Sequence, residues 1–269
     1  MTLEKILEKH NITEEELNNI LKQSKKPKLE KNNSHEHYFS TKKDKFIVTG
    51  DWHVGHKNFR EDAFEGLIKT IKKYKIERIY HCGDLLEGMS NRDGGIYELS
   101  YLGISNQLNE ANRLIQQLPC DMYFILGNHD LWSKIKSNQG FNIGKNLEEE
   151  NKNAHYLGDM KSEIKLSPTT KVWLTHEGNS AYALSYSGQK RINSIHGGQK
   201  PSLWFNGHLH KSLYMEYRNI HFFESGTLQQ QTDFMAMKGS PAHVGFWMID
   251  VYHNKKGINQ VRSSWFPYY

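Results

Sequence analysis

Five short apolar runs in this chain each end directly in residues that can bind metal ions. The runs are rich in Ile, Val, Tyr and Phe, and they span residues 46–49, 78–81, 122–126, 171–175 and 203–205. Runs of this length and composition are typical of buried strands. Because sites form at the carboxyl ends of parallel strands, we expect the polar residues that follow the five runs to meet at one edge of a sheet.

The segments between the first three runs have helical periodicity. Apolar residues recur at helical spacing in residues 59–74 and 105–118. The order strand, helix, strand, helix, strand is typical of a mainly parallel sheet that helices cover. Two later strand-like runs, 221–223 and 244–252, indicate a second sheet. We therefore predict an α/β fold, a two-sheet mixed β-sandwich flanked by helices.

The N-terminal part differs in its pattern of apolar and charged residues. Residues 1–22 have the pattern of two short helices, and residues 13–16 have the form of a capping box. Residues 22–45 are polar and lysine-rich, which is typical of a linker. We predict a helical appendage and basic linker over residues 1–40 and a catalytic domain over residues 41–269. The appendage either packs on the main body, which we favour because it is not strongly basic, or contacts nucleic acid as a helix-turn-helix.

The composition indicates the charge of the substrate and the cellular compartment of the protein. The formal net charge of +5 is compatible with an anionic substrate. Cys82 and Cys120 form no CxxC pair, which favours a reducing compartment. Neither an apolar leader nor a stretch of about 18 apolar residues is present. We expect a cytoplasmic protein with no membrane partner; the sequence does not predict its oligomeric state.

The residues that follow the five runs have side chains that can bind metal ions through nitrogen or oxygen. They are Asp51 and His53, then Asp84, then Asn128 with His129 and Asp130, then His176, and finally His208 and His210. Carboxylate, imidazole and amide groups without a thiolate suit Mn, Fe, Zn or Ni. Two such ions about 3.5–4 Å apart can activate a water and clamp the oxygens of a phosphoryl group. One Asp-x-His or His-x-His pair is weak evidence, but five clusters in order are hard to reach by chance.

The five motifs resemble those of the calcineurin-like metallophosphoesterases. The matching residues are Asp51-x-His53, Gly83-Asp84, Gly127-Asn128-His129-Asp130, His176 and Gly207-His208-x-His210, which lie within residues 46–210. The resemblance implies two divalent ions, with Mn²⁺ favoured and Fe, Zn or Ni as alternatives. It assigns Asp51, His53 and His210 to the first ion, and Asn128, His176 and His208 to the second, with Asp84 bridging both.

The resemblance also implies a mechanism. A metal-activated hydroxide would attack phosphorus in line, His129 would assist the leaving oxygen without binding metal, and Asp130 would support His129. The chain departs from common forms of the family at Glu87 and Glu177, which follow the second and fourth motifs. Neither departure removes a ligand.

Residues that select the substrate are harder to read from the sequence. His56, Arg92, Lys190 and Arg191 are candidate substrate-binding residues, although packing or plain surface exposure explains each of them equally well. Tyr182, Tyr186, Trp204 and Tyr214 could stack on bases or belong to the core. We favour a phosphodiesterase or nuclease acting on DNA, RNA or a nucleotide. The alternatives are a phosphomonoesterase or small-nucleotide hydrolase and, from another class, a catalytically idle metal-binding scaffold or nucleic-acid-binding module.

Overall fold

The structure is a computed structural model that describes residues 13, 34–36, 42–89, 94–132, 141–178 and 183–269. The chain separates into two compact units, residues 1–33 and 34–269. The helices predicted within residues 1–22 lie outside the described residues. The fold described below is that of the second unit.

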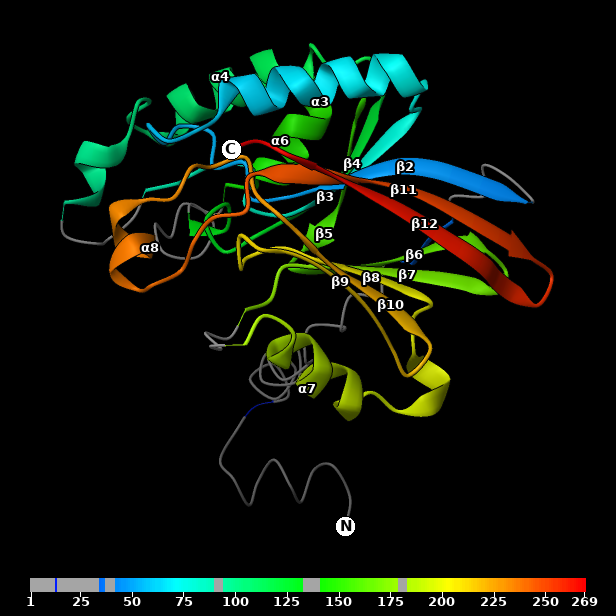
Figure 1. Ribbon diagram of the computed structural model, residues 1–269. Coiled ribbons are helices and arrows are strands. Elements are labelled where there is room, and N and C mark those ends of the chain that lie inside the picture. The colour runs from blue at the N-terminus through cyan, green and yellow to red at the C-terminus, as the bar shows by residue number, and fades with distance from the viewer. Residues whose placement is uncertain (1–12, 14–33, 37–41, 90–93, 133–140, 179–182) are drawn as a thin grey trace. The chain divides into compact units, whose positions relative to one another are not determined.

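Two six-stranded sheets form the centre of this unit (Figure 1). The first sheet has the order β12-β11-β2-β3-β4-β5. Its strands are β2 (Lys43–Thr49), β3 (Arg78–Cys82), β4 (Asp121–Leu126), β5 (Ala154–Asp159), β11 (Gly245–Asn254) and β12 (Gly257–Pro267). Strands β2 to β5 are parallel, and β11 and β12 extend the sheet in antiparallel fashion.

The second sheet has the order β1-β6-β7-β8-β10-β9. Its strands are β1 (Ser34–Glu36), β6 (Lys161–Ser167), β7 (Thr170–Thr175), β8 (Leu203–Asn206), β9 (Ser212–Tyr217) and β10 (Ile220–Ser225). The neighbours β7, β8 and β10 are parallel, whereas β6 and β9 pair with them in antiparallel fashion. This sheet is therefore mixed, like the first.

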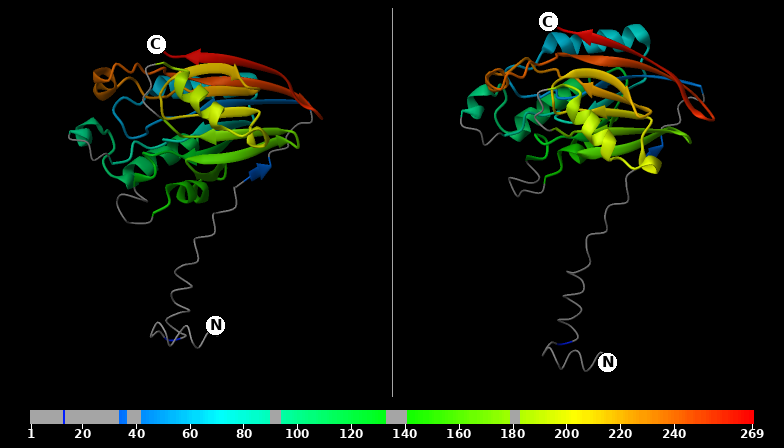
Figure 2. Two further views of the ribbon diagram at one scale, coloured as in Figure 1. Left: turned by 90° about the horizontal axis from the view of Figure 1, so that it is seen from below. Right: turned by 60° about the horizontal axis from the view of Figure 1, so that its bottom comes forward.

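Helices cover the outer faces of both sheets (Figures 1 and 2). The first sheet carries α3 (Glu61–Tyr74), α4 (Ile104–Ile115) and α6 (Ile143–Glu150), and the second sheet carries α7 (Tyr186–Ser194). Shorter helical segments are η1 (Gly95–Glu98), η2 (Gly197–Gln199) and α8 (Asp233–Met237). The layers run helix, sheet, sheet, helix, so the predicted two-sheet α/β sandwich is confirmed.

The alternation of strand side chains builds separate cores on the two faces of the first sheet. Along β2, Ile47 packs with the helices, whereas Phe46 and Val48 pack toward the second sheet. This alternation follows from the pleat of a strand. The rings of Phe46 and Phe205 lie 5.8 Å apart, edge to face, and join the two sheets. Each such fully buried side chain contributes roughly 1.5–3 kcal/mol to folding.

The helix predicted for residues 59–74 is α3, which begins at Glu61. Glu61 and Asp62 occupy its first turn, while Lys72 and Lys73 occupy its last. That charge order complements the helix dipole. The helix ends where Lys75 adopts a left-handed conformation with φ 52°.

Three features of the topology differ from the sequence-based expectations. The five apolar runs do not share one sheet: β2, β3 and β4 lie in the first, and β7 and β8 in the second. Residues 244–252, expected in the second sheet, form most of β11 in the first, while β1 lies within the predicted linker. These differences arise because sheet membership depends on pairing with distant strands. It does not follow from local periodicity.

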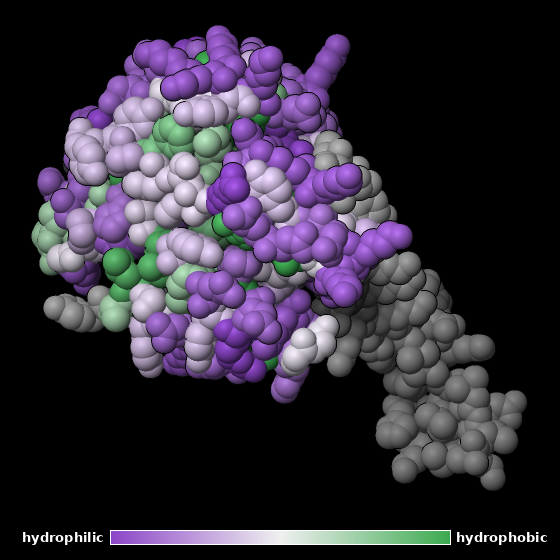
Figure 3. Space-filling model, turned by 45° about the vertical axis from the view of Figure 1, so that its right-hand side comes forward, coloured by the Kyte–Doolittle hydropathy of each residue, from purple (hydrophilic) through white to green (hydrophobic). Residues whose placement is uncertain are grey.

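One face of the molecule is mainly polar. The face shown in Figure 3 is mostly hydrophilic, and its hydrophobic areas are small and scattered. None of the helices in the described ranges combines the length and apolarity needed to cross a membrane.

Candidate metal centre and active site

Several residues in the turns that follow the strands have positive φ angles, an uncommon backbone conformation that positions their side chains. Non-glycine residues rarely have positive φ, because the Cβ atom meets the backbone there. The loops after β2 and β3 nevertheless use such angles and are joined by hydrogen bonds from Asp51 N to Gly83 O (2.9 Å) and from His53 N to Asp84 O (3.1 Å). Residues of the site with positive φ are Asp51 (52°), His53 (52°), Asp84 (53°), His208 (84°) and His210 (54°). Such strain gathers at functional sites, where the surrounding structure holds it in place.

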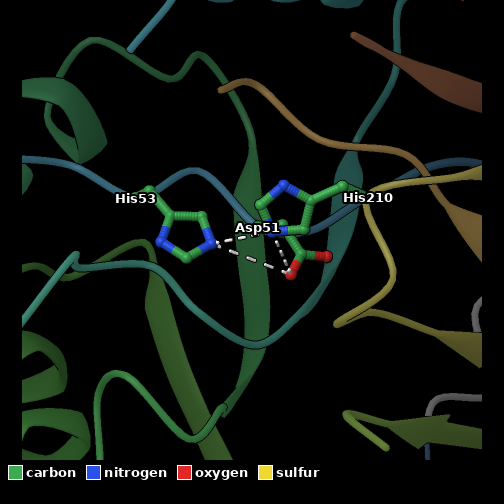
Figure 4. Close-up of side chains that lie close together, drawn as sticks. All are labelled: Asp51, His53 and His210. Atoms are coloured by element: carbon green, nitrogen blue, oxygen red, sulfur yellow. Dashed lines mark hydrogen bonds and ion pairs between the residues drawn. The ribbon is translucent and has the colours of Figure 1, made fainter. Parts of the chain in front are cut away.

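The first ligand cluster consists of Asp51, His53 and His210 (Figure 4). Both imidazoles point toward the carboxylate of Asp51. His210 Nε2 lies 3.4 Å from Asp51 Oδ1, and His53 Nε2 lies 4.0 Å from the same oxygen. The two Nε2 atoms are 3.0 Å apart. Three potential ligand atoms, from the ends of β2 and β8, therefore converge on one point.

The second cluster consists of Asp84, His176 and His208, with Asn128 beside them. His176 Nε2 lies 3.0 Å from Asp84 Oδ2 and 3.1 Å from Asn128 Oδ1. His208 Nδ1 lies 2.8 Å from the same amide oxygen. These residues follow β3, β4, β7 and β8, so both sheets contribute to the cluster.

Asp84 lies between the two clusters. Its Oδ2 atom is 3.0 Å from His176 Nε2 and 3.8 Å from His53 Nε2. Its Oδ1 atom accepts a hydrogen bond from the backbone N–H of His129 (2.8 Å). Burial raises the pKa of Asp84, but His176 and His129 outweigh it and hold the pKa well below its usual range. A bridging position for an ionised Asp84 thus agrees with the predicted role.

The residues present fit divalent metal ions. All seven predicted ligands come together, and their donor atoms are nitrogen and oxygen, the set that suits Mn, Fe, Zn or Ni. Two glycines leave room for them: a Cβ on Gly127 would lie 2.2 Å from Asp84 Oδ1, and one on Gly178 would lie 1.7 Å from His208 Cδ2. Burial lowers the pKa of His176, but Asp84 outweighs it and the pKa rises to about 10. With this pKa the imidazole of His176 holds a proton at neutral pH, and a bound cation would take the place of that proton.

Hydrogen bonds to the far ring nitrogens orient the histidine ligands. Nδ1 of His53 lies 2.7 Å from Glu87 Oε2, and Nδ1 of His176 lies 2.7 Å from Cys82 O. A donor bond from Nδ1 leaves the lone pair of Nε2 directed at the cluster. Glu87, one of the departures from common family forms, therefore supports a predicted ligand.

His129 stands beside the clusters at the edge of a cleft. Its Nδ1 atom lies 2.7 Å from the backbone oxygen of Glu87, and its side chain is 32% exposed. Burial lowers the pKa of His129, but Asp84 and Glu87 outweigh it and raise the pKa above its ordinary value. The half-exposed ring differs from the buried rings of His53 and His176.

Asp130 connects the loops that carry these residues. Its carboxylate accepts hydrogen bonds from the backbone N–H groups of Leu85 (3.1 Å), Leu86 (2.8 Å) and Gly127 (2.9 Å). Burial and the nearby Asp84 raise the pKa of Asp130 to about 7. Its support of His129 remains a prediction, and the structure adds this direct role in holding the Asp84 loop.

Asn206 is a supporting residue that sequence reasoning missed. Its Oδ1 atom accepts hydrogen bonds from Thr175 Oγ1 (2.6 Å) and Glu177 N (3.1 Å). Its Nδ2 atom donates to Glu177 O and to Glu224 Oε2, both at 2.9 Å. The side chain therefore ties together the ends of β7, β8 and β10 close to His176 and His208. An Asn before a Gly is a common turn signal, which hides such a role in the sequence.

A cleft of about 940 Å³ opens over the clusters. Its lining includes His53, Asp84, His129, His208 and His210. The cleft gives a substrate direct access to the predicted metal ligands and to His129. Sequence reasoning missed several other residues that line it, among them Lys211, Gln229, Phe234 and Lys238.

The predicted substrate-binding residues have different positions. His56 lines the cleft, whereas the described residues that line it do not include Lys190 or Arg191. Arg191 forms an ion pair with Glu177 at 2.7 Å. Arg92 lies outside the described residues. The roles of all four remain predictions.

The aromatic residues considered for base stacking are also dispersed. Trp204 is buried in the core beneath α7, at 3% exposure. Tyr186 and Tyr214 are exposed but are not among the described residues that line the cleft, and Tyr182 lies outside the described residues. The stacking interpretation of Trp204 is therefore wrong, because its indole is enclosed by other core side chains.

Comparison with known proteins finds distant similarities. A curated relative is the DNA polymerase II small subunit of Methanothermobacter thermautotrophicus, 24% identical over 232 residues that cover 68% of this chain and 47% of the relative. The chain thus spans about half the length of that relative. An archaeal phosphodiesterase of known structure has 13% identity and a TM-score of 0.47, covering 83% of this chain and 100% of its own. The phosphoesterase Yfce from E. coli has 14% identity and a TM-score of 0.42, covering 81% and 98%.

A family model provides the decisive comparison. The calcineurin-like phosphoesterase model matches residues 44–222, well over half of the chain. The match includes all five motifs that carry the predicted ligands. This chain belongs to the calcineurin-like phosphoesterase family.

Proposed function

We propose that this chain is a metal-dependent phosphodiesterase that hydrolyses a phosphodiester in nucleic acid or in a nucleotide. One observation carries the proposal: Asp84 lies between two ligand clusters, and His129 stands beside them at the edge of an open cleft. A site that only stored metal would need the seven ligands but no further imidazole beside them. The ligand set and His129 together support hydrolysis at phosphorus.

The seven ligands would hold two divalent ions, for which we propose Mn²⁺. Bound there, such ions supply a water of lowered pKa and neutralise charge on the phosphoryl oxygens. Asp51, His53 and His210 would hold one ion, and Asn128, His176 and His208 the other. Asp84 would contribute to both, because its Oδ2 atom faces a histidine of each cluster.

His129 would act on the substrate. Because its Nδ1 atom donates to the backbone oxygen of Glu87, Nε2 is the ring nitrogen left to meet the leaving oxygen. From that atom a proton would pass to the oxygen as the bond to phosphorus breaks. Glu87 would position both this ring and that of His53.

The lining of the cleft supports a diester as substrate. Leu184 and Ser187 come from the segment at the start of α7, and Phe234 and Lys238 come from α8 and the residue that follows it. A diester carries two substituents on phosphorus, and these two segments offer contacts beyond the metal ligands. The named activity of the curated relative, a DNA polymerase subunit, makes DNA the first nucleic acid to test.

The test compares bis-p-nitrophenyl phosphate with p-nitrophenyl phosphate in the presence of Mn²⁺. We expect a higher kcat/KM for the diester, and a preference for the monoester would reject the diesterase proposal. Labelled single-stranded and duplex DNA then test the substrate class. If DNA stays intact under conditions that cleave the diester, DNA is rejected as the substrate, and RNA and small nucleotides are the next to test. If no ester is cut with Mn²⁺, Fe²⁺, Zn²⁺ or Ni²⁺, the chain is a metal-binding scaffold.

A further inference from the structure

One wall of the cleft comes from a segment that the family match does not include. The match ends at residue 222, whereas Thr232, Phe234, Lys238, Pro241 and His243 all line the cleft. We call residues 230–242 the recognition loop. It contains α8 and lies between β10 and β11 (Figure 1).

The N-terminal end of the recognition loop is fixed to the loop that carries Asp51. Thr227 Oγ1 donates to Asp51 O at 2.6 Å, and Leu228 N donates to the same oxygen at 3.2 Å. Gln230 N then donates to Asn58 O at 2.8 Å. The start of the recognition loop therefore has a defined position relative to the first ligand cluster.

The C-terminal end is fixed to the loop that carries His210. His243 N donates to His210 O at 2.8 Å, and the ammonium group of Lys211 donates to the backbone oxygen of Pro241. Across the base of the recognition loop, Gln231 Nε2 donates to Ser240 O at 3.2 Å. Both ends are thus bound to segments that carry predicted metal ligands, so the recognition loop is held at a set place beside the centre.

The recognition loop presents an aromatic ring and a cation to the cleft. Phe234 is 44% exposed, although a large apolar side chain normally avoids water. Lys238 is exposed, and its Nζ atom lies 5.8 Å from the centroid of the Phe234 ring. The acidic residues that line the cleft, Asp84 and Glu87, lie at the metal end. An anionic ligand extending away from the clusters would therefore meet positive charge at this wall.

We propose that the recognition loop binds a single-stranded polynucleotide, with an unpaired nucleobase on the ring of Phe234 and a phosphate next to the scissile one on Lys238. Aromatic side chains stack on unpaired bases of any sequence, and lysines bind the backbone phosphates. Because Lys238 Nζ is close to the ring, a base on Phe234 carries its own phosphate within reach of the ammonium group. This assignment deepens the proposed function and rests on it.

Four variants test the assignment. Phe234→Ala and Lys238→Gln remove the proposed contacts. Met237→Ala is the matched control for the ring, because Met237 lies on α8 at 81% exposure but does not line the cleft. Lys255→Gln is the matched control for the cation, since Lys255 follows the ten-residue strand β11, about 30 Å from its start.

The readout is the ratio of kcat/KM for a single-stranded oligonucleotide to that for methyl p-nitrophenyl phosphate, a diester without a nucleobase or a second phosphate. We expect Phe234→Ala to lower this ratio about tenfold, within the range measured for base stacking. Lys238→Gln should lower it about threefold and reduce the slope of log affinity against log salt by about 0.7. Both control variants should keep the wild-type ratio.

The outcomes separate this assignment from the proposed function. If the wild type cleaves the small diester but the ratio is the same in all four variants, the assignment is wrong while the phosphodiesterase proposal stands. An equal fall of the kcat/KM ratio in Met237→Ala and in Phe234→Ala would also overturn the assignment, because the Phe234 ring would then have no specific role. If the wild type cleaves no diester, fluorescence anisotropy with a labelled single strand and the Mn²⁺-loaded protein decides. Weaker binding in Phe234→Ala and Lys238→Gln supports the recognition loop, and unchanged binding rejects it.

Discussion

At the scale of single residues, His129 lines the same cleft as the predicted ligands His53, His208 and His210 but has different contacts. The rings of His53 and His176 lie 3.8 Å and 3.0 Å from the carboxylate of Asp84. A ring nitrogen of His129 also lies within 4.8 Å of ligand atoms of Asp84 and His53, but His129 contacts that carboxylate through its backbone N–H and directs Nδ1 to the backbone oxygen of Glu87. We therefore expect His129→Ala to lower kcat by about 10²–10⁴-fold, the usual range for loss of a general acid, while the bound metal remains.

Steady-state kinetics and elemental analysis of the same samples measure both quantities. His196→Ala is the matched control, since His196 is an exposed histidine outside the cleft, and it should keep both activity and metal. Loss of metal from His129→Ala would instead make His129 a ligand.

Single residues also show where the sequence was sufficient and where it was not. Ligand-type residues could be found because each lies within a few residues of a strand end, and the resemblance to the calcineurin-like metallophosphoesterases selected the seven predicted ligands among them. The contacts of Asn206 and of Glu87, which the sequence marked only as a departure from common family forms, could not be predicted, since they depend on partners such as Glu224 and His53 that are distant in the sequence. Arg191 was a candidate for substrate contact, with plain surface exposure as the alternative, and its ion pair with Glu177 depends on how α7 packs.

At the scale of elements, a buried charged network joins three strands of the first sheet. Asp44 of β2 pairs with Arg78 of β3, and its other oxygen lies 3.0 Å from His253 Nε2 on β11. All three side chains are at most 3% exposed. Removing one partner of a buried pair leaves a charge without its counterion, which costs about 3–5 kcal/mol. We expect Asp44→Asn to lower the free energy of unfolding by about 3 kcal/mol.

Urea unfolding followed by tryptophan fluorescence measures that change. Glu65→Gln is the matched control, because Glu65 and Lys69 form an ion pair on α3 whose side chains are 65% and 77% exposed. Exposed pairs of this kind contribute less than about 0.5 kcal/mol. Equal effects of the two substitutions would contradict a structural role for the buried network.

The elements themselves were predictable to different degrees. Helices α3 and α4 were placed to within a few residues, because an amphipathic pattern is local. The sheet of β7 and β8 was not, because it depends on pairing with β6 and β10. Strand β1 was hidden in a lysine-rich segment, and its three residues gain their order from β6.

At the scale of the whole molecule, the predicted metal ligands come from both sheets. Asp51, Asp84 and Asn128 extend from the first sheet, while His176 and His208 extend from the second. The sequence could indicate a common site, since the motifs follow strand ends. It could not show that the site bridges a sandwich, because that depends on how the sheets pack. A ligand that binds across the two sheets should stabilise them together.

Mn²⁺ binding should therefore raise the melting temperature. A ligand at 100 times its dissociation constant stabilises the folded state by about 2.7 kcal/mol. For a unit of this size, 1 kcal/mol corresponds to about 2–4 °C, so we expect a rise of about 5–10 °C that a chelator reverses. Differential scanning fluorimetry measures this rise.

Two aspartate variants show whether the rise comes from the proposed site. Asp84→Asn should lose most of it, because the carboxylate that faces both clusters is replaced by a neutral amide. Asp121→Asn should keep it, since Asp121 lies at the start of β4, at the opposite end of that strand from Asn128, with a side chain that is 48% exposed. An equal rise in the wild type and in Asp84→Asn would place the stabilising ion elsewhere and remove Asp84 from its bridging role.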